Sequence, residues 1–141
     1  MKPKILIVDD EESIRKAVKA AFSQGYEVLS ASDGRAALEI IKNLKPDFVF
    51  LDIKMPVMSG IEVLALVKDT GAAPIIWMLT GEEELAVAVK ALEAGARGYL
   101  TKPFELERLR CVVSGALEGV EKKAHPEKFS DRPWLVKRAK K

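Results

Sequence analysis

Residues 47–60, DFVFLDIKMPVMSG, decide how the rest of the chain is interpreted. Residues 48–51 form a short unbroken apolar run rich in β-forming residues, which is typical of a strand buried on both faces in a parallel sheet. The run stops at Asp52, and Pro56 and Gly60 then predict a loop and the start of a helix. In open α/β sheets, ligands bind outside the carboxyl ends of the strands, where Asp52 would stand. Taken alone, Asp52 could equally turn the chain or cap a helix.

Apolar runs and amphipathic segments alternate along the whole chain. The runs predict strands at residues 5–8, 26–30, 48–51, 75–79 and 97–100. Apolar residues at helical spacing predict helices at 13–24, through 37–44, and at 59–68, 82–94 and 104–119. Five βα units in strict alternation imply a parallel sheet with helices on both faces and right-handed crossovers. We therefore expect an α/β, flavodoxin-like (βα)5 doubly wound parallel sheet with strand order 2-1-3-4-5.

Length and composition favour one globular domain. The chain has 141 residues, enough for a sizeable core, and its 48% hydrophobic content is ordinary for such a domain. No apolar run approaches the roughly 20 residues that span a bilayer, and the first run is too short for a signal peptide. The single cysteine, Cys111, excludes an internal disulfide and a cysteine metal cluster. A cytoplasmic location is the expectation.

The charge is unevenly distributed and suggests a boundary near residue 120. Residues 121–141 carry eight basic and three acidic residues, so their net charge is +5, which leaves −3 of the total +2 for residues 1–120. We expect a folded domain over 1–120 and a basic C-terminal tail or linker over 121–141, too short for an output domain with its own core. DNA binding is not favoured, and His125 is expected in an exposed loop. Apolar side chains in the tail could dock on the body or on a partner, or begin a linker: Phe129, Trp134, Leu135 and Val136.

The predicted topology brings polar residues from four strand ends together. Asp9 and Asp10 follow the first strand, Asp52 the third, Thr80 the fourth and Lys102 the fifth. Crowded carboxylates repel one another, and a hard cation such as Mg²⁺ relieves that repulsion with oxygen ligands. An ammonium and a hydroxyl nearby suit a phosphoryl group, and a carboxylate can accept one as a nucleophile. The pattern therefore indicates phosphoryl transfer.

Each of these residues also has a structural interpretation. Asp9 and Asp10 could simply open the first helix, Thr80 could be a helix N-cap, and Lys102 could be a solvated loop lysine. Tyr99 could be a half-buried core aromatic. The joint placement of polar groups at successive strand ends favours the functional interpretation.

The chain resembles the receiver domain of two-component response regulators, in a chemotaxis-regulator-like form, over about residues 3–120. The motifs that carry the resemblance are Asp9-Asp10, Asp52-x-x-Met55-Pro56-x-x-x-Gly60, Thr80-Gly81, Tyr99 and Lys102-Pro103. The resemblance implies that Asp52 is the phosphoacceptor and takes its phosphoryl group from a histidine kinase or a histidine phosphotransfer protein. It also implies a Mg²⁺ ion held by Asp9, Asp10, Asp52 and the backbone carbonyl of Lys54.

The resemblance further implies a conformational switch. Lys102 is expected to pair with the phosphoryl oxygens and Thr80 to move towards them, while Tyr99 rotates into the vacated space. A cis peptide is expected at Lys102-Pro103. The face formed by the fourth helix, fifth strand and fifth helix would then bind a downstream protein or an output domain. Such a module catalyses only its own phosphorylation and dephosphorylation.

Two details distinguish this chain within the resemblance. Gly81 stands where many relatives have Ala, so the loop that carries Thr80 could be looser. Our hypothesis is that Lys54 and Glu82 face each other across the site and limit access of water to the phosphoryl group.

Two other classes of protein share parts of this pattern. A Mg²⁺-dependent phosphatase of the haloacid dehalogenase group also uses an aspartyl nucleophile, but its two acids lie two residues apart after the first strand. Here Asp9 and Asp10 are adjacent, and Lys54 stands two residues after Asp52. A flavodoxin-type or nucleotide-binding module needs a glycine-rich phosphate loop after the first strand, where this chain has acidic residues.

Overall fold

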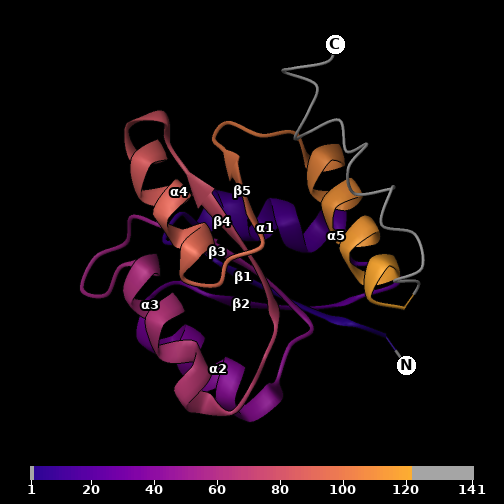
Figure 1. The fold of residues 1–141 in the computed structure, drawn as a ribbon. Coiled ribbons are helices and arrows are strands. Elements are labelled where there is room, and N and C mark those ends of the chain that lie inside the picture. Colours follow the sequence, from indigo (N-terminus) through magenta and orange to yellow (C-terminus); the bar gives the residue numbers. More distant parts are fainter. Residues whose placement is uncertain (1, 122–141) are drawn as a thin grey trace. The chain divides into compact units, whose positions relative to one another are not determined.

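The computed structural model describes residues 2–121, which belong to two compact units (Figure 1). The unit of residues 1–104 holds a five-stranded sheet and the helices that connect its strands, and the unit of residues 105–141 holds one described helix. The strands are β1 (Lys4–Val8), β2 (Glu27–Ala31), β3 (Phe48–Asp52), β4 (Ile75–Thr80) and β5 (Gly98–Thr101). The helices are α1 (Glu12–Ala21), α2 (Gly34–Leu44), α3 (Gly60–Val67), α4 (Leu85–Glu93) and α5 (Leu106–Glu121), with 3-10 turns η1 (Lys68–Thr70) and η2 (Glu82–Glu84).

The sheet is parallel throughout, and its strand order is β2-β1-β3-β4-β5. This confirms the predicted flavodoxin-like order. β1, β3 and β4 have neighbours on both sides, so the strand ends that carry Asp9, Asp52 and Thr80 lie next to one another at one edge of the sheet. The topology thus assembles the polar residues that the sequence placed far apart.

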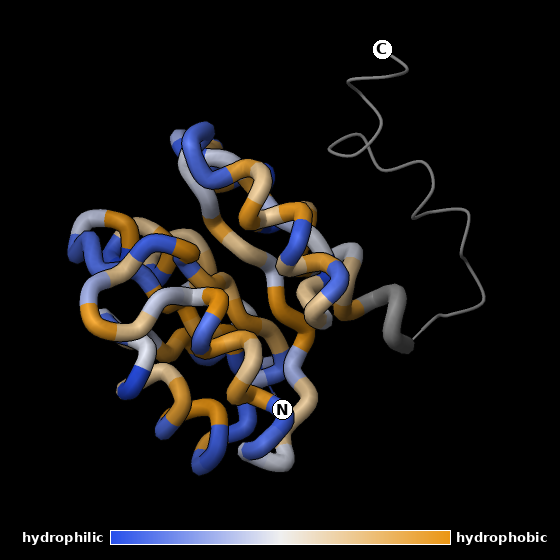
Figure 2. Tube along the Cα trace, turned by 60° about the vertical axis from the view of Figure 1, so that its left-hand side comes forward, coloured by the Kyte–Doolittle hydropathy of each residue, from blue (hydrophilic) through white to orange (hydrophobic). Residues whose placement is uncertain are grey.

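One face of the sheet packs against α2, α3 and α4, which lie together on one side of it (Figure 1). The central strands contribute alternate residues to this core, and the three helices contribute their apolar stripes. Hydrophobic residues follow one another along the strands but alternate with hydrophilic ones along the helices (Figure 2). The core residues on this side include Leu6, Val8, Val49, Leu51, Ile76, Met78, Ala37, Ile41, Val63, Leu64, Ala88 and Ala91.

The opposite face of the sheet carries an aromatic cluster. Phe22, just after α1, packs against Phe50 of β3 with ring centroids 6.2 Å apart, and Tyr26 meets Phe22 edge-on at 5.4 Å. Phe48 and Phe50 are also in contact, at 4.8 Å. Because Phe50 alternates with Val49 and Leu51, its ring points away from the core side, which places α1 on the other face of the sheet.

Several element ends differ from those predicted. β2, β3, β4 and β5 each extend one residue further than their apolar runs, so Asp52 and Thr80 belong to the strands rather than to the loops. Their main chains are fixed by the sheet, with Asp52 opposite Leu79 and Thr80 opposite Thr101. α1 ends at Ala21 rather than at residue 24, and the helix predicted at 82–94 begins as the 3-10 turn η2.

Part of the sequence interpretation falls on the tail. His125 and the apolar residues at 129 and 134–136 lie outside the described residues. Among the residues that the structure describes, no helix combines the length and the apolar character needed to cross a membrane.

Candidate functional site

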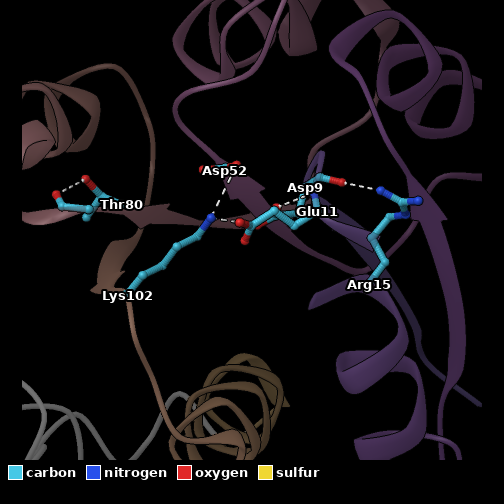
Figure 3. Close-up of polar contacts among 7 residues, drawn as sticks. Asp9, Glu11, Arg15, Asp52, Thr80 and Lys102 are labelled. Atoms are coloured by element: carbon cyan, nitrogen blue, oxygen red, sulfur yellow. Dashed lines mark hydrogen bonds and ion pairs between the residues drawn. The ribbon is translucent and has the colours of Figure 1, made fainter. Parts of the chain in front are cut away.

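The ammonium group of Lys102 lies between two buried carboxylates at the carboxyl end of the sheet (Figure 3). Its Nζ is 3.0 Å from Oδ2 of Asp9 and 3.4 Å from Oδ2 of Asp52. Asp9 is fully buried and Asp52 is 4% exposed, whereas the Lys102 side chain keeps a quarter of its surface in solvent. Lys102 is therefore not a solvated loop lysine but the counter-charge of the site.

Asp9 is held in place from several directions. Its Oδ1 accepts a hydrogen bond from the backbone N–H of Glu11 at 2.9 Å, and its carbonyl oxygen accepts one from Nη1 of Arg15 at 2.8 Å (Figure 3). Its own N–H donates to the carbonyl of Ala31 at 3.1 Å. Asp9 thus faces the site and also fixes the N-cap residue of α1, Glu11, although it does not itself cap the helix.

Burial of Asp52 makes its charged form unfavourable. The pKa of Asp52 is raised from 3.8 to about 7. Burial is the largest cause, and the charges of Asp9 and, less strongly, of Asp10 also raise this pKa, whereas Lys102 lowers it. The pKa of Lys102 is also raised, which for a lysine favours the charged form. Burial acts to lower its pKa, but the hydrogen bond to Asp9 and the charges of Asp52 and Asp9 outweigh burial and raise it.

Asp9, Asp10 and Asp52 form a possible cation site. One carboxylate oxygen from each lies within 4.8 Å of the other two, with Asp9 and Asp52 buried and Asp10 exposed. An octahedral Mg²⁺ with bonds of about 2.1 Å spans ligand separations of about 3 to 4.2 Å, and it retains several waters. The donor set is all oxygen and anionic, and a cation would offset the repulsion that raises the pKa of Asp52. The residues present therefore fit a hard divalent ion.

Thr80 is buried near the site but does not form a polar contact with Asp52 in this structure. Its hydroxyl donates a 2.9 Å hydrogen bond to the carbonyl of Gly81, its own neighbour in the chain (Figure 3). The N-cap position of η2 is Gly81, with no side-chain cap, so Thr80 is not the N-cap that its sequence position allowed. The same Gly81 carbonyl also accepts the N–H of Glu84 at 3.0 Å. Thr80 is thus held by its own loop.

Tyr99 and Pro103 occupy the positions expected from the sequence. Tyr99 lies in β5 opposite Met78 and is half-buried against the core on the α4 side of the sheet. The Lys102–Pro103 peptide is cis, as predicted. The backbone N–H of Lys102 donates to the carbonyl of Thr80 at 2.7 Å, which ties the ends of β4 and β5 together.

The partner of Lys54 differs from the one predicted. Nζ of Lys54 lies 3.8 Å from Oε2 of Glu84, so the ion pair across the site uses Glu84 and not Glu82. The side chain of Lys54 is 74% exposed and that of Glu84 only 21%. The segment after Gly81 is a 3-10 turn, with about three residues per turn. Glu82 and Glu84 therefore project from different sides of this turn, and Glu84 lies on the side of Lys54.

The loop between β3 and α3 approaches the acceptor closely. A Cβ at Gly60 would overlap the carbonyl oxygen of Asp52, so only glycine allows α3 to begin against the end of β3. The N–H of Gly60 donates to the carbonyl of Ile53 at 2.8 Å and closes the loop. At the loop tip, Val57 has a φ of 70° and is 91% exposed. A β-branched residue is rare in this backbone region.

Sequence reasoning missed two residues of the site. Arg15 has no distinguishing signal in the sequence, because it stands on the polar side of an amphipathic helix. Glu84 is one of three consecutive glutamates after Gly81, and its selection by Lys54 depends on the turn.

Comparisons with known proteins identify the family of the chain. The family model described as the response regulator receiver domain matches residues 5–114. The regulatory protein AtoC of Escherichia coli K12 is 40% identical over 116 residues, which are 82% of this chain and 25% of that protein. The response regulator MprA of Mycobacterium sp. strain KMS is 38% identical over 137 residues, 96% of this chain and 58% of that protein. The chain therefore spans between a quarter and three fifths of these curated relatives.

Solved structures of similar proteins share the fold. A CheY-like receiver domain protein of Methanospirillum hungatei JF-1 has a TM-score of 0.81 and 32% identity, covering 87% of this chain and 99% of that one. The chemotaxis protein CheY4 of Vibrio cholerae has a TM-score of 0.74 and 36% identity, covering 81% and 98%. The receiver domain of NtrX from Brucella abortus has a TM-score of 0.75 and 36% identity over the same shares.

Proposed function

We propose, since this chain belongs to the response regulator receiver domain family of two-component systems, that Asp52 accepts a phosphoryl group from a phosphohistidine of a partner protein. The donor is a sensor histidine kinase or a histidine phosphotransfer protein. The observation that carries the proposal is the placement of Lys102 between the buried carboxylates of Asp9 and Asp52. A fixed cation beside a buried acceptor carboxylate suits the charge of a transferring phosphoryl group.

The transfer needs an ionised acceptor. A carboxylate oxygen of Asp52 forms the new bond to phosphorus, while the bond from phosphorus to the imidazole nitrogen breaks and the electron pair stays on that nitrogen. With a pKa of about 7, Asp52 is only partly ionised at neutral pH. Mg²⁺, held by Asp9, Asp10, Asp52 and, in this proposal, the carbonyl of Lys54, would supply the positive charge that favours the ionised form. Lys102 would neutralise the phosphoryl oxygens.

Phosphorylation would then rearrange the loop that carries Thr80. The phosphoryl group adds nearly two negative charges and three acceptor oxygens beside Asp52. The Thr80 hydroxyl now bonds only to the Gly81 carbonyl, so it can exchange that acceptor for a phosphoryl oxygen. Tyr99, half-buried in the neighbouring strand, would move into the space that Thr80 leaves. The result is a shift between two conformations of one site.

The α4 helix, which follows the Thr80 loop, has an exposed apolar face. Leu85, Val89 and Leu92 lie at positions i, i+4 and i+7 of α4 and are all exposed, so they share one face of the helix. An exposed apolar stripe next to a switching loop suits a protein partner. We propose that this face of α4, with Tyr99, binds the downstream protein or an output domain. A cytoplasmic location and activity limited to the protein's own phosphorylation and dephosphorylation belong to the same proposal.

One experiment tests the acceptor. The protein is incubated with Mg²⁺ and acetyl phosphate or phosphoramidate, and its mass is measured. We expect a single phosphoryl adduct that is stable in acid and labile in base. Asp52→Asn should abolish the adduct, whereas the matched control Asp69→Asn, an exposed residue in η1, should keep it. Turnover of many phosphate esters would favour the aspartyl-nucleophile phosphatase instead; no observation on this chain favours that alternative.

A further inference from the structure

The ion pair between Lys54 and Glu84 joins the two loops that flank the acceptor site. Lys54 stands directly after Ile53, whose N–H donates to the carbonyl of Leu79 at 3.0 Å and continues the pairing of β3 with β4. Glu84 ends the η2 turn, four residues after Thr80. Their side chains meet at 3.8 Å. The Lys54–Glu84 pair therefore links the loop after Asp52 to the loop that carries Thr80.

The hydrogen bonds around Gly81 connect this pair to Thr80. The Gly81 carbonyl accepts both the Thr80 hydroxyl at 2.9 Å and the Glu84 N–H at 3.0 Å. Fixing Glu84 through its carboxylate therefore also fixes the carbonyl that holds the Thr80 hydroxyl. Thr80 can leave this acceptor more readily when the turn that presents it is free to move.

We infer that Lys54 and Glu84 are positioning residues that hold the Thr80 loop in its resting arrangement and so oppose the phosphorylated conformation. This inference rests on the proposed function and extends it. A contact that stabilises only the resting state lowers the apparent affinity for any ligand that needs the other state. The pair is partly exposed, and such pairs contribute little free energy, so its removal should change affinity by about two- to fivefold.

The test uses beryllofluoride with Mg²⁺, a stable substitute for the phosphoryl group on a carboxylate, and follows its binding by tryptophan fluorescence or NMR. Glu84→Gln should tighten binding of beryllofluoride by about two- to fivefold. In the Lys54→Met background, the same substitution should have no effect. Lys54→Arg, which keeps the positive charge, should preserve the effect of Glu84→Gln.

Two matched variants separate the pair from general electrostatics. Glu82→Gln and Glu83→Gln each remove one negative charge from the same 3-10 turn but leave the Lys54–Glu84 pair intact. Equal gains from all three glutamine variants would overturn the inference and show a diffuse charge effect. A gain from Glu84→Gln that persists without Lys54 would also overturn it.

A second measurement does not depend on phosphoryl chemistry. The N–H of Leu85 donates to the carbonyl of Glu82 and reports on the η2 turn. Glu84→Gln and Lys54→Met should each lower the hydrogen-exchange protection factor of this amide by about two- to fivefold, with no further loss in the double variant. Unchanged protection would overturn the inference. If the wild type does not bind beryllofluoride but the exchange results are as expected, the proposed function is contradicted and the inference about the Lys54–Glu84 pair is not.

Discussion

The Lys102 ammonium lies 3.4 Å from the Asp52 carboxylate, so the cation expected to hold a phosphoryl group already stands beside the acceptor in the resting protein. In the proposed phosphorylation of Asp52, Lys102 would then need to move little. Electrostatic groups that are fixed before the reaction cost no reorganisation when charge moves. The resting arrangement has its own consequences for stability, because a partly exposed lysine compensates two buried carboxylates.

Replacing Lys102 should destabilise the protein in a pH-dependent way. Lys102→Met leaves the buried carboxylates of Asp9 and Asp52 without their cation, and we expect a loss of about 1–3 kcal/mol at pH 8, since Lys102 is partly exposed. At pH 5 the loss should be smaller, because Asp52 is then protonated. Urea denaturation at both pH values measures this. Lys90→Met on the exposed side of α4 should have little effect, and equal losses at the two sites would contradict the argument.

Removing the charge of Asp52 should stabilise the metal-free protein above neutral pH. The folded protein keeps a proton on Asp52 up to about pH 7, whereas the unfolded chain releases it near pH 4. Between these values the folded state binds more protons, so its stability falls as pH rises. Asp52→Asn should therefore raise the free energy of unfolding by about 1–3 kcal/mol at pH 8, with solvent screening reducing the full effect, and by almost nothing at pH 4. A gain that does not vary with pH would refute this account.

Magnesium should stabilise the folded protein through the three-carboxylate site. A ligand at 100 times its dissociation constant adds about 2.7 kcal/mol to the free energy of unfolding. We expect the melting temperature to rise with Mg²⁺, and to rise more at pH 8 than at pH 5, because binding needs an ionised Asp52. Asp10→Asn should reduce the rise, whereas Asp69→Asn should not. Thermal unfolding with and without Mg²⁺ gives the comparison.

A methyl group at Gly60 should be much more costly than one at Gly81. At Gly60 it would overlap the carbonyl oxygen of Asp52, which belongs to the sheet and cannot move away, so Gly60→Ala should cost more than about 2 kcal/mol. At Gly81 the nearest atoms are carboxylate oxygens of the flexible Glu83 side chain, at 3.0 Å. Gly81→Ala should change stability by less than about 0.5 kcal/mol. Similar costs, measured by denaturation, would show that the loop after β3 can adjust.

The sequence was sufficient to predict the fold and most of the site. Apolar runs that end in Asp9 or Asp52 mark parallel strands, and the strand order then brings both residues to Lys102. The pattern could not reveal where Thr80 points, because one hydroxyl has several acceptors within reach of its rotamers. It also could not identify Glu84 as the partner of Lys54, because three neighbouring glutamates differ only in their angle around a turn. Side-chain direction within irregular segments is decided by packing, which no short pattern encodes.

The ends of helices were also only partly predictable from local sequence. The predicted first helix ran to residue 24 because its apolar spacing continues through Phe22, but α1 ends at Ala21. Phe22 instead packs on Phe50 of the sheet, and this contact between distant parts of the chain accompanies the early end of the helix. Local spacing therefore predicted the helix correctly and its last turn incorrectly.

The two side-chain oxygens of Asp9 serve different parts of the molecule. Oδ2 faces Lys102 in the site, while Oδ1 accepts the N–H of Glu11 at the entrance to α1. Any cation or anion that redistributes charge on this carboxylate therefore also alters the anchoring of the first helix. The amide resonances at the beginning of α1 should consequently act as a built-in spectroscopic reporter of site occupancy, on the face of the sheet remote from α4.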